Sequence, residues 1–175
     1  MSNKVGVFID CAALGRGCQR QFQTNRVDFP KLLEQLKMFG DVTRAIAFVT
    51  HTSDGNVELQ NKFNYLLSQS GYEVRTKISK RFEGSDEYRY VTWNVGMTLA
   101  IVDSMKDWEI AIIGSGDGCM MDVAKYLTKK HLSVYTAGFK RSTSLELVKF
   151  SERFIELNRS VVYAPGLHTE LNHPV

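Results

Sequence analysis

Two aspartates stand at the ends of short apolar runs, where their carboxylates could hold a divalent cation. Asp10 ends the run GVFID, and Asp117 ends the segment AIIGSGD. Hard cations such as Mg²⁺ prefer oxygen ligands, and a bound cation can activate water and neutralise charge on a phosphate. If the two runs are neighbouring parallel strands, both carboxylates lie at the edge of the sheet where ligands bind in such folds. Alternatively, each Asp only caps the helix or turn that follows it.

The elements that would position these aspartates alternate between strand and helix. Apolar or alternating runs typical of strands span 5–9, 42–50, 72–78, 109–114 and 132–137, with a short strand or sheet edge at 154–157. Apolar residues at helical spacing span 28–39, 57–69, 93–105, 120–130 and 144–151. This order predicts an α/β fold, a three-layer α/β/α domain with a mostly parallel central sheet of about five strands.

Two polar stretches are interpreted as loops, and the end of the chain as a tail. The segment GRGCQRQFQTNR, residues 15–26, is interpreted as a polar loop after the first strand. Residues 79–90, SKRFEGSDEYRY, are interpreted as an exposed charged loop. The sequence predicts one domain over residues 1–160 and a flexible tail over 161–175, which has no periodic apolar pattern.

Composition limits the class of protein. The chain has 175 residues, 43% of them hydrophobic, which is about the length and apolar content of one domain. No apolar run reaches the roughly 18 to 20 residues that span a bilayer, so no membrane is expected. The three cysteines have no CxxC spacing, which argues against a disulfide framework or a zinc site and favours a reducing cytoplasm. A formal charge of +3 is compatible with an RNA partner.

Several segments carry a resemblance to a known family. They are FID at the end of the first strand, the helix opening WNVG at 93–96, the turn SGDG at 115–118 and the closing segment TSLELVKFSERFIEL. Together they resemble the NYN/LabA-like branch of the PIN-like ribonucleases over residues 4–158. The resemblance implies a PIN-like α/β/α fold and cleavage of RNA with Mg²⁺ or Mn²⁺. It also implies that Asp10 and Asp117 are catalytic metal ligands, and that Asn94 assists as a third ligand through its uncharged carbonyl oxygen.

The chain departs from the family pattern at several polar positions. Asn94 stands where the family's helix opening has an Asp, and Cys119 and Met120 replace the last two residues of SGDxDF. Ala13 replaces the Asn that commonly follows the first acid. Losing one carboxylate about 4 Å from a cation forfeits up to ~4 kcal/mol per unit of cation charge at an effective dielectric near 20. A weakened metal site is therefore expected, and Cys119 is interpreted as a small apolar residue opening a helix.

Basic residues on the predicted loops are candidates for binding RNA. They are Arg16, Lys80, Arg81, Lys140 and Arg141, which all follow predicted strands and so belong to the same edge as the aspartates. Lysine and arginine there would neutralise phosphates and make binding dependent on salt. The alternative is that these charges only keep the protein soluble.

Two functions stay open from the sequence. The first is a divalent-metal-dependent endoribonuclease in which Asp10 and Asp117 hold the metal and Asn94 assists. The alternative is a catalytically inactive NYN/PIN-like module that binds RNA or a protein partner, because Ala13, Asn94 and Cys119 replace polar family residues. A homo-oligomer that uses the edge of the sheet is a further possibility.

Overall fold

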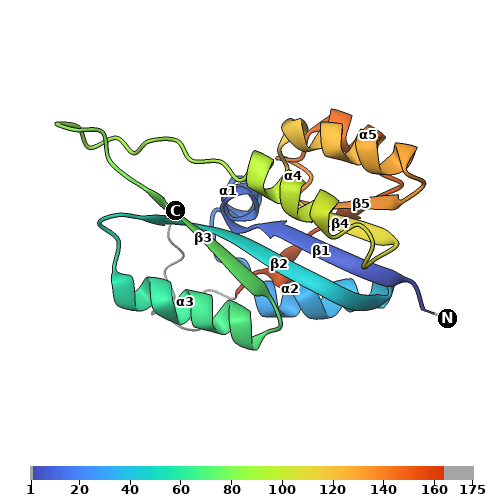
Figure 1. Cartoon of the computed structure of the whole chain (residues 1–175). Helices are drawn as coiled ribbons and strands as arrows, with labels where there is room; N and C mark the ends of the chain where they lie inside the picture. The colour runs from blue at the N-terminus through green and yellow to red at the C-terminus, as the bar shows by residue number, and fades with distance from the viewer. Residues whose placement is uncertain (1, 164–175) are drawn as a thin grey trace.

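The computed structural model describes residues 2–163 and consists of a central sheet between two layers of helices (Figure 1). The sheet has the order β3-β2-β1-β4-β5-β6, and every neighbouring pair is parallel. Its strands are β1 Lys4–Asp10, β2 Asp41–Thr52, β3 Glu73–Ser79, β4 Ile110–Gly114, β5 Ser133–Gly138 and β6 Arg153–Glu156. The expected α/β/α architecture is confirmed. The expected count of about five strands was short by one, and the sixth strand, β6, is the short strand or sheet edge expected at 154–157.

Helices cover both faces of this sheet. They are α1 Cys11–Phe22, α2 Phe29–Leu36, α3 Val57–Gln69, α4 Asn94–Asp103, α5 Met121–Lys129 and α6 Leu145–Lys149, with short 3-10 helices η1 Lys37–Phe39, η2 Gly118–Met120 and η3 Arg159–Val161. Apolar residues of α1, α2 and α3 pack on one face, and those of α4, α5 and α6 pack on the other. The side chains of β1 show the consequence. Val7 and Ile9 enter the first of these cores and Phe8 enters the second, which is why β1 is a continuous apolar run.

Helix α1 contradicts the interpretation of residues 15–26 as a loop. Asp10 caps its first turn, where the side-chain Oδ1 accepts a hydrogen bond from Ala13 N at 2.9 Å. The helix ends at Gln23, whose φ of 61° lies in the left-handed region. Its glycines lower its helix propensity, and between residues 15 and 22 only Cys18 and Phe22 are apolar, so this part of the sequence carries little helical signal. Packing of the buried Leu14 and Cys18 against the core stabilises it instead.

The helices predicted at 28–39 and 57–69 are present. In α2, Asp28 caps the first turn by accepting from Lys31 N at 3.0 Å, and Pro30 lies in that turn. The last turn of the predicted segment is the 3-10 helix η1, and the chain leaves it at Gly40, whose φ is 152°. Asn56 caps α3, which ends at Gln69 as predicted.

An exposed segment, residues 80–92, joins β3 to α4 and is called the arm below. It extends away from the sheet as a long loop at the upper left of Figure 1. Arg81 and Tyr88 form an antiparallel bridge within it, and Arg89 N donates to Lys80 O at 2.8 Å. The predicted exposed loop is therefore present, folded back on itself.

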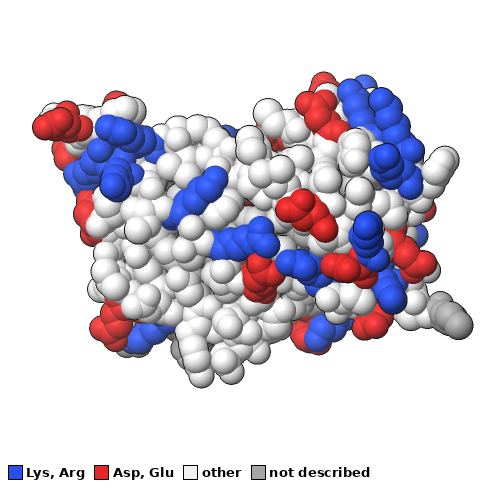
Figure 2. Space-filling model, viewed as in Figure 1, with Lys and Arg blue, Asp and Glu red and all other residues white. Residues whose placement is uncertain are grey.

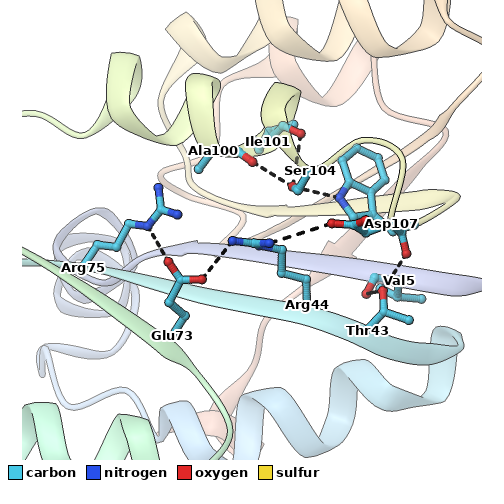
Figure 3. A network of polar contacts seen from close by, with 10 residues as sticks. Val5, Thr43, Arg44, Glu73, Arg75, Ala100, Ile101, Ser104 and Asp107 are labelled. Atoms are coloured by element: carbon cyan, nitrogen blue, oxygen red, sulfur yellow. Dashed lines mark hydrogen bonds and ion pairs between the residues drawn. The ribbon is translucent and has the colours of Figure 1, made fainter.

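Polar contacts tie together the other end of the sheet, where β1, β2 and β3 begin (Figure 3). Glu73 accepts from Arg44 Nη2 at 3.0 Å and from Arg75 Nε at 2.7 Å. The buried Trp108 donates its Nε1–H to Ser104 Oγ at 3.1 Å, and Ser104 Oγ donates to a carbonyl of α4 at 2.7 Å. These contacts lie at the amino ends of the strands and stabilise the sheet away from the aspartates.

The end of the described chain packs on the domain. Val161 is buried, Val162 bridges to Val27, and Tyr163 N donates to Arg26 O at 3.0 Å. Residues 161–163 are the first residues of the segment predicted as a tail, and residues 164–175 lie outside the described part. Among the described helices, none is long and apolar enough to cross a membrane.

Candidate active site at the carboxyl ends of the strands

The candidate site lies where the order of the strands reverses. β1 pairs with β2 on one side and with β4 on the other, so Asp10 at the end of β1 lies near Asp117, which follows β4. Both aspartates line one hollow together with Asn94 and Arg16. In open parallel sheets, ligands bind at this crevice. The hollow has a volume of about 10 Å³, which is about the room that one water molecule needs.

Asp117 is held by hydrogen bonds on both of its carboxylate oxygens. Asn94 Nδ2 donates to Oδ2 at 2.8 Å, and Cys119 N donates to Oδ1 at 2.9 Å. Partial burial acts to raise the pKa of Asp117, but the hydrogen bonds from Asn94 and Cys119 and the charge of Arg16 together lower it below its usual value. Asp117 is therefore an ionised, oriented carboxylate. In this structure Asn94 supports that carboxylate through its N–H group.

Asp10 differs from Asp117 because it is almost fully buried. Its side chain also caps α1 through Ala13 N. Burial raises the pKa of Asp10 above its usual value, the hydrogen bond from Ala13 and the charge of Arg16 oppose this, and the negative charge of Asp117 adds to it. A further positive charge beside Asp10 would offset the cost of burying its charged form. The site thus joins one carboxylate stabilised by hydrogen bonds to one whose charge is incompletely compensated.

The residues of the hollow fit a magnesium-type cation. Such a cation commonly uses one or two carboxylates, keeps several waters and completes its coordination with substrate phosphate. Asp10 and Asp117 supply that donor set. Within residues 2–163, no group of three or more His, Cys, Asp or Glu side chains gathers as a metal site. The donor set therefore suits a hard cation bound weakly in the absence of substrate.

Comparison with known proteins gives the family of the chain. The model of the NYN domain matches residues 4–158. The chain belongs to the NYN domain family. This match confirms the resemblance found in the sequence, and the PIN-like fold that it implied agrees with the three layers described above.

The NYN domain also has a counterpart among solved structures. The crystal structure of a protein of unknown function from Vibrio parahaemolyticus is similar to it with a TM-score of 0.77 and 20% sequence identity, over 93% of this chain and 97% of that one. At this identity the likeness shows the shared fold only. No curated protein matches the chain.

Two further residues of this NYN domain line the hollow and have unpaired polar atoms, and sequence reasoning missed the first of them, Thr50. Thr50 Oγ1 and Trp93 Nε1 are buried and have no hydrogen-bond partner in the described part of the chain. Buried polar groups are ordinarily paired, so unpaired ones beside a candidate site point to a missing ligand or water. Thr50 was detectable in the sequence, because it is a polar residue at the end of an apolar strand that reaches the same edge as Asp10.

The predicted RNA-binding residues are spread over three elements. Arg16 lies on α1 and lines the hollow. Lys140 and Arg141 are exposed on the loop that leaves β5, and Arg141 N donates to Gln21 on α1 at 3.3 Å. Ser142 of that loop lines a shallow groove together with Arg16 and Asp117. This loop therefore borders the site.

Lys80 and Arg81 lie on the arm, where Figure 2 shows basic and acidic side chains together. Arg81 forms ion pairs with Asp54 and Asp86, both at 2.6 Å. It also lies over the ring of Tyr88, 5.1 Å from its centroid. The charge of Arg81 is thus compensated within the protein, and Lys80 is the more available of these two cations.

Proposed function

We propose that this NYN domain is a divalent-metal-dependent endoribonuclease with a weakened metal site. The observation that supports it is the convergence of Asp10 and Asp117 on one hollow at the switch point of the sheet, beside Arg16. Membership of the NYN family gives the PIN-like fold in which such a site is expected.

Asp10 and Asp117 would hold Mg²⁺ or Mn²⁺ through their carboxylate oxygens. When bound, such a cation activates water and neutralises charge on the phosphate that is attacked. No covalent nucleophile from the protein is required. Burial raises the pKa of Asp10, and a cation bound beside it would favour its charged form.

The other residues of the hollow orient the carboxylate of Asp117 and supply positive charge. Asn94 and the amide of Cys119 fix the two oxygens of Asp117, so that its carboxylate is held ready and does not turn freely. Arg16 lies close enough to both aspartates to lower the pKa of each. Its guanidinium would face a phosphate brought to the hollow, and a planar fork of N–H donors suits phosphate oxygens.

A second candidate function is a catalytically inactive module that binds RNA. The observation that favours it is the role of Asn94, which donates an N–H to Asp117 where the family pattern has a carboxylate. With only two acids in the hollow, metal affinity can fall below the concentration at which turnover is measurable. RNA binding through Arg16 and the loop after β5 would persist in that case.

The deciding experiment compares wild type with Asp117→Asn. Both proteins are assayed for cleavage of single-stranded and structured RNA in Mg²⁺, in Mn²⁺ and in a chelator. The matched control is Asp103→Asn, the same change on an exposed residue at the far end of α4. We expect Asp117→Asn to lose about 100-fold or more of the activity, because a metal-bound phosphate is stabilised by several kcal/mol. Asp103→Asn should cleave as wild type does.

The result also separates the two functions. Metal-dependent cleavage by wild type that is lost in Asp117→Asn excludes the inactive module. Wild-type protein that binds RNA but shows no cleavage in either metal excludes the nuclease. Background cleavage that is equal in wild type and Asp117→Asn identifies a contaminant and counts against the nuclease.

A further inference from the structure

A second, larger pocket lies directly beside the acidic hollow. It has a volume of about 300 Å³ and opens between α1, α2, α3 and the end of β2, at the lower end of the roughly 300 to 1,000 Å³ of small-molecule sites. Ala12, Arg16 and Thr50 line both the pocket and the hollow. A ligand in the pocket would therefore be in contact with the residues that border the two aspartates.

The walls of this pocket divide into an apolar interior and a polar rim. Phe29, Val49 and Phe63 form the interior and are nearly fully buried, with Phe29 and Phe63 in edge-to-face contact at 5.9 Å. Gln19 and Asn25 add side-chain amides at the rim. An amide carries both donors and an acceptor, so it can pair with the edge of a heterocycle. The pocket thus suits a flat apolar ring with polar atoms on its edge.

The charge at the rim favours an anionic ligand. Arg16 and Arg20 both line the pocket, and in residues 2–163 neither has an ion-pair partner within 4.0 Å. The same two arginines also line the polar groove that includes Asp117 and Ser142. Positive charge therefore runs from the pocket past the hollow, as a sugar–phosphate chain would require.

We propose that this pocket holds one unpaired nucleobase of the RNA whose phosphate lies at the acidic hollow. The proposal rests on the proposed function, since it makes the pocket a subsite of that same RNA. A base can enter only if it is free of its pairing partner, so the pocket selects single-stranded or looped RNA.

The test measures binding, so that it does not depend on cleavage. Short single-stranded oligoribonucleotides carry one abasic ribose, placed at successive positions, and their Kd is measured by fluorescence anisotropy in a chelator. We expect one position to weaken binding by roughly 5- to 100-fold, the usual effect of losing one base contact. Abasic sites at other positions should have smaller effects.

A pair of variants at Gly15 ties this effect to the pocket. A Cβ at Gly15 would lie 3.6 Å from Asn25 O, an ordinary contact, so a side chain can start there. Gly15→Leu should fill the pocket and abolish the difference between the intact and the abasic oligonucleotide. Gly15→Ala makes the same change in helix propensity without filling the pocket and should keep that difference. Circular dichroism checks that both variants fold, and Asn25→Ala gives an independent variant that should reduce the difference.

The other outcomes count against the pocket or against the nuclease, and they can be told apart. The proposal is wrong if all abasic positions bind alike, if Gly15→Leu and Asn25→Ala both discriminate as wild type does, or if no oligonucleotide binds. If Gly15→Leu lowers thermal stability and leaves discrimination intact, the base does not occupy this pocket. If the protein cleaves RNA but no abasic position weakens binding, the pocket proposal is wrong and the nuclease proposal stands. If one abasic position weakens binding but the protein cleaves no RNA, the nuclease proposal is wrong and the pocket proposal stands.

Discussion

At the scale of single residues, the site contains two carboxylates in different electrostatic states. Asp117 is ionised and held by Asn94 and Cys119, whereas Asp10 is buried and carries a raised pKa. Asn94 stands where the family pattern has a carboxylate, so the proposed metal site has two acids. Two predictions follow from these states.

Asn94→Asp should strengthen metal binding and weaken the metal-free protein. The new carboxylate would lie within hydrogen-bond distance of Asp117, where Asn94 now donates at 2.8 Å. We expect Mn²⁺ to bind at least about tenfold more tightly by calorimetry, a fraction of the ~4 kcal/mol per unit cation charge that an unscreened carboxylate would add. Without metal, repulsion should lower the melting temperature. The control is Asn61→Asp, an exposed position on α3, and equal Mn²⁺ affinity in both variants would contradict the prediction.

Asp10→Asn should stabilise the metal-free protein at neutral pH. The pKa of Asp10 in the folded protein lies above its ordinary value of 3.8, so folding favours the neutral carboxyl. Its contribution to stability is complete below the ordinary pKa and is lost as the pH rises through the raised one. Asparagine keeps the cap of α1, since it is as good an N-cap as aspartate. Urea unfolding in a chelator from pH 3 to 7 should show a gain for Asp10→Asn that grows with pH, and a loss of stability at pH 7 would refute this.

At the scale of elements, some strands and helices that form the site were predictable from the sequence and others were not. The apolar runs of β1 and β4 predicted two buried strands, and their pairing confirms the expected convergence of the strand ends. Residues 15–22 of helix α1 were predicted as a loop, because their glycines and polar residues give little helical signal, and tertiary packing stabilises the helix. The large pocket was not predictable, since it forms between α1, α2, α3 and β2 only after they pack.

The contacts at the amino ends of the strands should differ in strength. Ser104→Ala leaves the buried Nε1–H of Trp108 without its acceptor and should destabilise the protein by about 1–3 kcal/mol. Glu73→Gln weakens the partly exposed ion pairs with Arg44 and Arg75 and should cost less than about 1 kcal/mol. Urea unfolding of both variants measures the two values. A larger loss for Glu73→Gln would show that the ion pairs, and not the indole contact, stabilise this end of the sheet.

At the scale of the whole molecule, net charge alone says little about an RNA partner. The formal charge is +3, and on the arm Arg81 is neutralised by Asp54 and Asp86. What the sequence could not show is which cations lack an ion-pair partner, because that depends on side chains brought together from distant segments. Arg16 and Arg20 are such cations within the described residues, and both border the site.

The salt dependence of RNA binding should therefore arise from few residues. Each phosphate contact on single-stranded RNA contributes about 0.7 to the slope of log K against log salt concentration. Arg20→Ala should reduce the magnitude of that slope by about 0.7, whereas Lys106→Ala, in the segment between α4 and β4, should leave it unchanged. Binding isotherms between low and physiological salt measure both slopes. Equal slopes in the two variants would mean that Arg20 does not contact phosphate.

The separation of the two aspartates along the chain affects when the site can exist. β1, β2 and β3 come from the first part of the polypeptide, whereas Asp117 follows β4, which pairs with β1 from the other side. A nascent chain leaving the ribosome holds Asp10 long before Asp117 has been translated. The complete hollow therefore forms only when most of the domain has been synthesised and folded, so incomplete chains near messenger RNA lack the paired carboxylates.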